Sequence, residues 1–222
     1  MAQVNRLALF DCDGTLVDSQ ASICLAMEHC FEGQKLAPPS REAIRRIVGL
    51  SLVEAIARLH PEAERDLHEA MAEAYKQAYF ELRTAGRIED EPLYEGVLEA
   101  IETLEASGWV LGVATGKSDR GLIRVLEHHG LRHRFVTLQT ADRHPSKPHP
   151  SMVEAAVAEA GAAPETTAMI GDTSFDMAMA RAAGAHAIGV AWGYHSRQEL
   201  ADAGARHVLE HARELPAHLE AL

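Results

Sequence analysis

A run of apolar residues near the start of the chain leads directly into acidic residues. Residues 7–10 read Leu-Ala-Leu-Phe, a pattern typical of a strand that is buried on both faces. If the extended geometry continues to Asp13, the period of two places the Asp11 and Asp13 side chains on the same side. Gly14 then allows the backbone to turn. The pattern predicts two carboxylates in one pocket at a strand end, where open α/β sheets bind their ligands.

Residues 18–90 follow helical patterns and contain no convincing strand. Ser51 and Glu54 form a capping-box pattern, and Gly49 interrupts the helical pattern just before it. We expect four helices, over residues 19–31, 41–48, 55–59 and 61–85. We interpret this stretch as a separate all-helical unit.

From residue 92 onward, helical and strand patterns alternate, which favours a βαβ series with a parallel sheet. We expect strands over 109–114, 135–139, 167–170, 186–190 and 206–209, and helices over 96–107, 118–129, 150–160 and up to residue 183. The predicted fold class is therefore α/β. Its core consists of residues 1–17 and 91–222, and residues 18–90 form a helical insertion after the first strand.

The composition is that of a folded protein and narrows the range of partners. Of 222 residues, 47% are hydrophobic and 24% charged, enough for a substantial core. A net charge of -12 argues against nucleic acid or an anionic membrane as the main partner, but a small anionic substrate stays compatible. The first apolar run is too short for a signal peptide or a membrane span, so we expect a cytoplasmic protein. The three cysteines lack metal-site spacing and are expected to be buried apolar residues.

Further polar residues stand where the other predicted strands end. Thr115 and Gly116 follow the second strand, Lys147 lies beyond the third, and Asp172 and Asp176 follow the fourth. Because the carboxyl ends of parallel strands share one edge of a sheet, these groups can converge with Asp11 and Asp13. Each residue alone also fits an ordinary structural role, such as a solvated lysine or a helix-capping acid. Together and in this order, they favour a site.

Phosphoryl transfer is the chemistry that these residue types fit. Several carboxylates in one pocket repel each other and any phosphate, so a hard cation such as Mg²⁺ is expected. Asp11 can attack phosphorus to form an aspartyl phosphate, and Asp13 can protonate the leaving oxygen and later deprotonate water. Thr115 and backbone N–H groups at Gly116 can hold the phosphoryl oxygens, and Lys147 can offset their charge.

The four segments resemble the motifs of the haloacid dehalogenase superfamily of phosphohydrolases. The matching residues are Asp11-Cys12-Asp13-Gly14-Thr15, Thr115, Lys147-Pro148 and Gly171-Asp172-Thr173-Ser174-Phe175-Asp176. The resemblance implies a Rossmann-like core, with Asp11 as nucleophile and Asp13 as acid/base. It implies Mg²⁺ held by Asp11, the backbone carbonyl of Asp13 and Asp172, with Asp176 in support. It also implies that residues 18–90 are a cap that closes over the site.

Within that superfamily, the chain looks most like phosphoglycolate phosphatase-like enzymes. The similarity lies in Asp18-Ser19, Lys147-Pro148-His149-Pro150, Ala180-Arg181-Ala182-Ala183-Gly184 and Trp192-Gly193-Tyr194. The chain departs from many relatives in having Gly116 before Lys117 where they carry Asn, which leaves the backbone to bind the phosphate there. The implied partner is a small phosphorylated metabolite, and the implied state is a monomer or homodimer.

The helical unit is less diagnostic of the substrate. The turn Gly49-Leu50-Ser51 is expected to face the active site, because a helix-breaking glycine and basic residues adjoin it. Arg46, Gly49 and Ser51 are therefore candidate specificity residues. An exposed basic helix face is the simpler interpretation of Arg46.

Three other functions stay open from the sequence. A β-phosphoglucomutase-like enzyme shares the core motifs, but this chain lacks the early His and the Arg after the cap turn that we expect there. A phospho-accepting receiver lacks a long helical insertion and a second Asp two residues after the first. A non-catalytic phosphate-binding protein would not turn over p-nitrophenyl phosphate, and that assay separates it from an enzyme.

Overall fold

The computed structural model describes residues 4–222, so residues 1–3 of the predicted core lie outside the described part. Six parallel strands form one sheet in the order β3-β2-β1-β4-β5-β6, with β1 in its interior. The α/β fold with a parallel sheet is thus confirmed. The strands are β1 (Asn5–Phe10), β2 (Val110–Thr115), β3 (Phe135–Thr140), β4 (Ala162–Gly171), β5 (His186–Val190) and β6 (His207–Leu209).

Helices cover both faces of the sheet, as the apolar run in β1 requires. Ala8 and Phe10 pack on one face with α5 (Val97–Ala106), α6 (Asp119–His128) and α10 (Leu215–Leu219). Leu7 and Leu9 pack on the other face with α7 (Ser151–Ala160), α8 (Ser174–Ala182) and α9 (Arg197–Asp202). Burial of each of the large side chains of Leu7, Leu9 and Phe10 contributes about 1.5–3 kcal/mol to folding. The strand that carries the first acidic residues is therefore held firmly from both sides.

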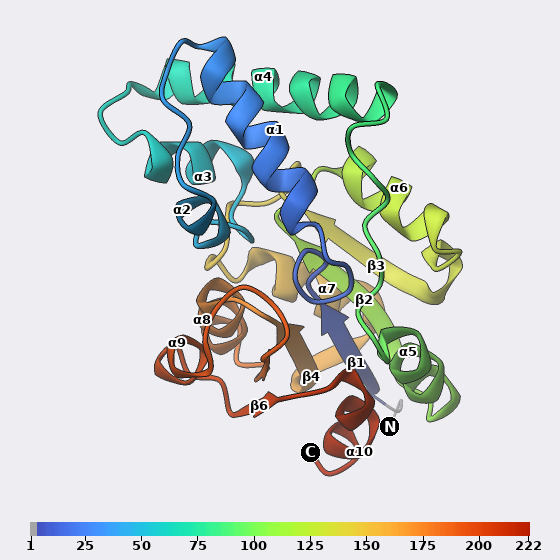
Figure 1. Cartoon of the computed structure of the whole chain (residues 1–222). Helices are drawn as coiled ribbons and strands as arrows, with labels where there is room; N and C mark the ends of the chain where they lie inside the picture. Colours follow the sequence, from blue (N-terminus) through green and yellow to red (C-terminus); the bar gives the residue numbers. More distant parts are fainter. Residues whose placement is uncertain (1–3) are drawn as a thin grey trace.

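The first four helices pack around a core of their own. They are α1 (Gln20–Gly33), α2 (Arg41–Arg45), α3 (Leu52–Leu59) and α4 (Arg65–Thr84). Their shared cluster contains Cys24, Met27, Phe31, Ile56 and Met71 among its buried members. In Figure 1 these helices lie together at the top, and the arrowheads of β1 and β2 point toward them. We propose on this basis that residues 18–90 form a cap domain over the strand ends.

The chain enters and leaves this helical unit at adjacent points. The Asp18 amide donates to the Pro92 carbonyl at 2.9 Å, and the Tyr94 amide donates to the Leu16 carbonyl at 3.0 Å. The two crossing segments therefore run side by side as a short paired link.

Several element ends differ from the sequence-based expectation. Helix α2 ends at Arg45 because residues 46–48 continue in tight turns, where the Val48 amide bonds to the Arg45 carbonyl at 3.3 Å. Helix α4 begins at Arg65, since Pro61 lies in a turn closed by the Ala63 amide and the His60 carbonyl. The short helices α9 and α10 were not predicted, because five or six residues show too little periodicity.

The capping box predicted at Ser51 and Glu54 is wrong. Ser51 does precede α3, but its side chain makes no capping hydrogen bond. Its backbone amide instead donates to the Ser146 hydroxyl at 2.9 Å, across the contact between cap and core. Glu54 pairs with Arg65 at 2.5 Å on the surface. The Ser51 amide therefore bonds to a residue distant in sequence instead of to the nearby Glu54 side chain.

Two other expectations can be compared with the structure. Cys12, Cys24 and Cys30 are free and buried, as predicted. Within residues 4–222, every helix is too short or too polar to cross a lipid bilayer.

Candidate active site

The predicted strand geometry does not continue into the acidic residues. Strand β1 ends at Phe10, and the next residues turn so that the Leu16 and Val17 amides donate to the Cys12 carbonyl. The Asp11 amide still donates to the Ile170 carbonyl of β4 at 2.9 Å, but the extended geometry does not continue to Asp13. Both Asp11 and Asp13 are nevertheless buried in the loop that follows β1.

Gly14 is required in this turn for two reasons. Its φ of +84° lies in the left-handed region that side chains disfavour. A Cβ at this position would also lie 2.1 Å from Oδ2 of Asp172. The glycine therefore lets the loop after β1 approach the carboxylate that follows β4.

Lys147 joins the first and last acidic segments. Its ammonium lies 2.9 Å from Oδ1 of Asp11 and 2.7 Å from Oδ1 of Asp176, and all three side chains are fully buried. Burial alone would lower the pKa of Lys147, but the two carboxylates raise it above its usual range. Lys147 therefore stays charged and offsets part of the negative charge in the pocket.

The fourth segment places two carboxylates in different roles. Asp172 is bound by Thr15, whose hydroxyl donates to Oδ1 at 2.9 Å, and by the Tyr194 amide, which donates to Oδ2 at 2.9 Å. Asp176 lies at the N-terminus of α8, where its Oδ2 accepts hydrogen bonds from the Thr173 amide and hydroxyl. Both oxygens of Asp176 are thus already engaged, as suits a supporting position.

Asp11, Asp172 and Asp176 together form a cluster suited to a hard cation. One oxygen of each lies within 4.8 Å of the others, and Oδ2 of Asp11 is buried without a hydrogen-bond partner. Burial raises the pKa of Asp11 to about 7, and burial with repulsion from Asp11 raises that of Asp172 well above its usual range. Three carboxylates against one lysine leave an excess of negative charge, which a cation with oxygen ligands would relieve.

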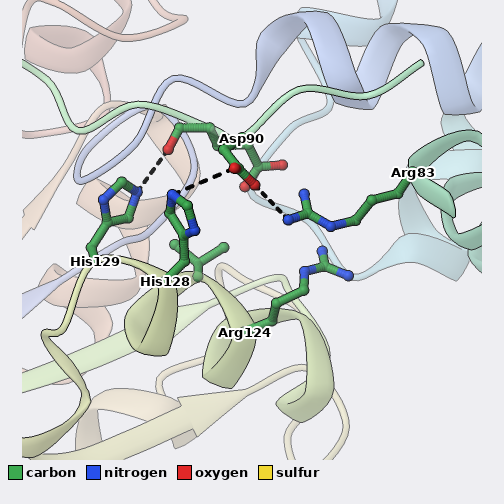
Figure 2. Close-up of a pocket in the computed structure, with 7 residues that line it drawn as sticks. Arg83, Asp90, Arg124, His128 and His129 are labelled. Atoms are coloured by element: carbon green, nitrogen blue, oxygen red, sulfur yellow. Dashed lines mark hydrogen bonds and ion pairs between the residues drawn. The ribbon is translucent and has the colours of Figure 1, made fainter. Parts of the chain in front are cut away.

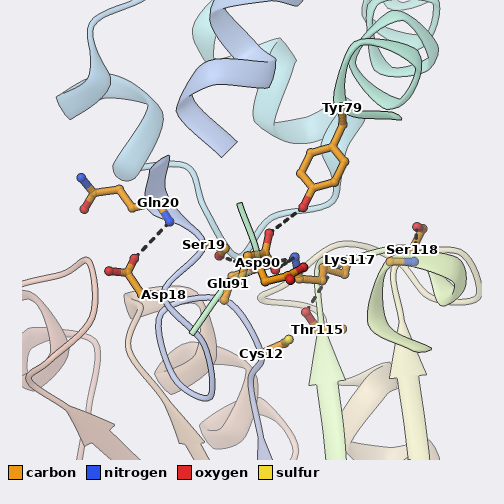
Figure 3. A network of polar contacts seen from close by, with 12 residues as sticks. Cys12, Asp18, Ser19, Gln20, Tyr79, Asp90, Glu91, Thr115, Lys117 and Ser118 are labelled. Carbon is orange, nitrogen blue, oxygen red and sulfur yellow. Dashed lines mark hydrogen bonds and ion pairs between the residues drawn. The ribbon is translucent and has the colours of Figure 1, made fainter. Parts of the chain in front are cut away.

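The Asp13 carboxylate faces a different set of groups. The Lys117 ammonium lies 2.8 Å from its Oδ1, and the Ser19 hydroxyl donates to the same oxygen. Figure 3 shows this region, with Ser19 and Lys117 from distant parts of the chain close together. The metal-ligand role predicted for Asp13 belongs to its backbone carbonyl, so its side chain is not needed in the cation cluster.

The predicted phosphate-binding residues lie at the end of β2, under the cap turn. Thr115 is fully buried, and its hydroxyl accepts from the Lys117 amide at 3.2 Å. A Cβ on Gly116 would lie 2.5 Å from the Leu50 carbonyl oxygen and 2.7 Å from that of Gly49. The turn of residues 49–51 therefore rests directly on the second motif.

Replacing Gly116 with alanine should displace that turn. Backbone carbonyls cannot yield to a new methyl group as a side chain can, so the cap must shift. We expect kcat/KM for small phosphomonoesters to fall about 10- to 100-fold, the usual cost of a displacement near 1 Å. Gly33→Ala is the matched control, because its Cβ would have no neighbour within 4 Å. Equal kcat/KM values in the two variants would contradict a tight contact between the turn and the core.

The three candidate specificity residues are not brought together. Gly49 and Ser51 lie against core loops, near Thr173 and Ser146 respectively. The Arg46 side chain is 63% exposed and pairs with Glu199 of α9 at 3.2 Å. The structure thus places Gly49 and Ser51 at the boundary of the pocket and Arg46 outside it, where it links the cap to the core.

Some residues in the pocket were not assigned a role from the sequence. Ser19 and Tyr194 lie in stretches that resemble known enzymes, and their hydroxyl oxygens are 3.2 Å apart beside Asp13. Lys117 follows the phosphate-binding segment, but its partner Glu91 lies in an acidic stretch with no motif. Only the fold brings these residues together.

Comparison with known proteins agrees with this geometry. The family model "Haloacid dehalogenase-like hydrolase" matches residues 8–190. The chain is 36% identical over 196 residues to "Probable phosphatase IndB" of Dickeya dadantii, covering 87% of this chain and 84% of that protein. It is 29% identical to a phosphoglycolate phosphatase of Agrobacterium fabrum, covering 86% and 82% respectively.

A solved structure supports the same assignment. The crystal structure of a hydrolase from Pseudomonas syringae superposes with a TM-score of 0.85 at 27% identity, covering 99% of both chains. It has the same arrangement over essentially the whole length. With the acidic motifs converging at one sheet edge and the family model matching most of the chain, the protein belongs to the haloacid dehalogenase-like hydrolases.

Proposed function

We propose that this phosphatase hydrolyses small phosphomonoesters in two steps through a phosphorylated Asp11. The observation that carries the proposal is the Asp11 carboxylate itself. One of its oxygens is fixed by Lys147 at 2.9 Å and by the Cys12 amide at 2.7 Å, and the other is buried without a partner. Such a carboxylate is oriented and available to react.

In the first step, a carboxylate oxygen of Asp11 forms a bond to phosphorus. The bond from phosphorus to the leaving oxygen breaks, and the electron pair goes to that oxygen, which takes a proton from the Asp13 carboxyl group. Lys147, Thr115 and the backbone N–H at Gly116 are the groups proposed to hold the phosphoryl oxygens and offset their charge. The products are a free alcohol and an aspartyl phosphate.

In the second step, the Asp13 carboxylate takes a proton from a water molecule. The water oxygen attacks phosphorus, and the bond from phosphorus to Asp11 breaks with its electron pair returning to the carboxylate. Inorganic phosphate leaves, and Asp13 is again protonated. Closure of the cap over the strand ends would exclude other water during this cycle.

The donor set around Asp11 fits a resident Mg²⁺. Asp11, the backbone carbonyl of Asp13 and Asp172 would hold the ion, and Asp176 would support it through Lys147. When bound, Mg²⁺ neutralises the charge that develops on the transferred phosphoryl group. The support is the excess of buried carboxylates and the unpartnered Oδ2 of Asp11.

Chemical trapping tests the mechanism directly. The enzyme is mixed with p-nitrophenyl phosphate labelled on phosphorus, quenched in acid and digested. The result expected is an acid-stable, hydroxylamine-labile label on the peptide that contains Asp11. Turnover with label on a different residue, or a label that hydroxylamine does not release, would overturn the proposal.

Replacing Asp13 with asparagine should slow turnover roughly 10²- to 10⁴-fold, the usual contribution of general acid/base catalysis. The amide cannot donate and accept the proton, but Asp11 still attacks. With p-nitrophenyl phosphate, whose leaving group needs little protonation, labelled enzyme should therefore accumulate. Rapid-quench measurement of the labelled fraction checks this outcome. Loss of label together with loss of rate would contradict the role of Asp13 in the second step.

For the substrate class we propose a small phosphorylated metabolite similar to phosphoglycolate. The support is the likeness to phosphoglycolate phosphatases and the close seating of residues 49–51 on Gly116. A panel of phosphoglycolate, hexose phosphates and nucleotides with Mg²⁺ would rank the substrates. Comparable kcat/KM for large nucleotides would contradict a small-substrate site. A cytoplasmic location and a monomeric or homodimeric state stay predictions.

A further inference from the structure

A second group of charged residues lies beside the catalytic pocket. Lys117, directly after the second motif, has its ammonium 2.8 Å from Oδ1 of Asp13 and 3.3 Å from Oε2 of Glu91. The side chains of Lys117, Asp13 and Glu91 are only 11%, 9% and 3% exposed. A buried carboxylate such as Glu91 is costly unless it is bonded on several sides. Its presence therefore calls for a structural or functional reason.

Glu91 is held from the cap and from the core at once. The Tyr79 hydroxyl of α4 donates to Oε1 of Glu91 at 2.7 Å. The His129 ring at the end of α6 donates from Nε2 to the Glu91 carbonyl at 2.8 Å. Figure 3 shows the Tyr79 ring reaching down from the cap to the cluster that contains Glu91 and Lys117. Glu91 therefore has little freedom to move independently of the link between cap and core.

Asp90, which precedes Glu91, makes further contacts with both the cap and the core. Asp90 pairs with Arg83 of the cap at 2.5 Å and lies 3.7 Å from the His128 ring of the core. Figure 2 shows these contacts, with His129 against the backbone of the same segment. The second crossing segment is thus tied to α4 on one side and to α6 on the other, directly before Pro92 pairs with Asp18.

The two contacts of the Asp13 carboxylate are made by the same oxygen. Lys117 and Ser19 both bind Oδ1, so the carboxyl group is held by one oxygen. A lysine side chain has four rotatable carbon bonds and would not hold this position without a second partner. Glu91 supplies that second partner, with its Oε2 3.3 Å from the ammonium.

We propose that Glu91 and Lys117 are positioning residues for Asp13, with Glu91 holding the Lys117 ammonium against Oδ1 so that Oδ2 faces the leaving oxygen. The inference rests on the proposed acid role of Asp13. It extends that role to two residues that do not touch the phosphoryl group. Because Tyr79 belongs to the cap, the orientation of Asp13 depends on the cap being seated.

The test compares two substrates of similar size whose leaving groups differ in their need for a proton. p-Nitrophenyl phosphate releases an acidic phenol, whereas benzyl phosphate releases an alcohol that must be protonated. Loss of a positioned acid lowers kcat/KM for benzyl phosphate more than for p-nitrophenyl phosphate. A purely structural defect lowers both values by the same factor. Neither the p-nitrophenyl nor the benzyl group carries a carboxylate, so direct binding of a substrate carboxylate by Lys117 does not enter the comparison.

The quantity compared is kcat/KM for benzyl phosphate divided by kcat/KM for p-nitrophenyl phosphate. We expect Lys117→Met to reduce this ratio at least ~10-fold, Glu91→Gln to reduce it about 5-fold, and Tyr79→Phe to reduce it least. The graded order follows the distance of each residue from Asp13 along the chain of contacts. Glu91→Gln keeps the shape of the side chain, so it tests the proposal even if Lys117→Met does not fold. Thermal melts establish that each variant is folded.

Glu159→Gln is the matched control. Glu159 is also a carboxylate in a polar network, where it accepts from Thr137 at 2.6 Å and Gln139 at 2.8 Å, but it is an exposed residue that lies outside the pocket. This control should leave the ratio unchanged. If Glu91→Gln and Lys117→Met behave like Glu159→Gln, the positioning role is wrong.

Asp13→Asn separates this inference from the proposed function. If Asp13→Asn also leaves the ratio unchanged, the acid role itself fails and the inference falls with it. If Asp13→Asn lowers the ratio strongly and the Glu91 and Lys117 variants do not, the acid role stands and only the inference is overturned.

Discussion

Replacing Asp11 with asparagine should give a folded protein that does not turn over phosphomonoesters. The amide keeps the size of the carboxylate, and its oxygen can still accept the hydrogen bond from the Cys12 amide and the contact from Lys147. Its NH₂ group then occupies the place of Oδ2, which has no partner to lose. An amide oxygen is a poor nucleophile, so we expect kcat to fall at least ~10⁴-fold, in line with the loss of a covalent nucleophile in other enzymes.

The measurement is kcat with p-nitrophenyl phosphate, together with a thermal melt. Removing one of three crowded carboxylates should leave the melting temperature equal to or above that of the unmodified protein without metal. Asp66→Asn, on the exposed first turn of α4, controls for the loss of a charge elsewhere. Activity of Asp11→Asn within tenfold of that control would remove Asp11 from the role of nucleophile.

Replacing Asp172 with alanine should lower kcat strongly and abolish its dependence on Mg²⁺. The carboxylate is fully buried opposite Asp11, and the ion would lose one of its protein ligands. If the ion supplies about 4 kcal/mol of charge stabilisation in the transition state, kcat falls about 10³-fold.

Thermal stability gives a second readout that does not need activity. Mg²⁺ at a hundred times its Kd should stabilise the unmodified protein by about 2.7 kcal/mol, and the Asp172→Ala variant should show no such increase. Asp202→Ala serves as control, because Asp202 is an exposed acid whose contact is Gln198 on the same helix. An undiminished Mg²⁺ response in Asp172→Ala would place the ion elsewhere.

The sequence predicted those parts of the site that follow from strand ends. Thr115 ends a strand, Asp172 directly follows one and Lys147 lies in the loop beyond one, and a parallel sheet has one carboxyl edge where such residues meet. The helical insertion was likewise visible, because helical periodicity without strands persists over about seventy residues.

Contacts between cap and core could not be predicted in the same way. Ser51 looks like a helix cap in sequence, but its amide bonds to Ser146, which lies 95 residues away. Glu91 lies in an acidic stretch whose sequence is typical of a solvent-exposed segment. In the structure it is buried, and its carboxylate contacts Tyr79 and Lys117. The free energy of these pairs depends on how two separately packed units sit together, and no local pattern encodes that.

The paired crossing segments at Asp18–Pro92 and Leu16–Tyr94 have a consequence for how such proteins diversify. Since residues 18–90 leave and rejoin the α/β core at neighbouring positions, the whole helical unit can be exchanged for another without a change in the strands of the sheet. Natural variation or laboratory grafting can then replace the helices near the strand ends and leave the buried acidic cluster untouched. Glu91 limits such an exchange, because a transplanted helical unit would need a hydrogen-bond donor in place of the Tyr79 hydroxyl to bind the Glu91 carboxylate.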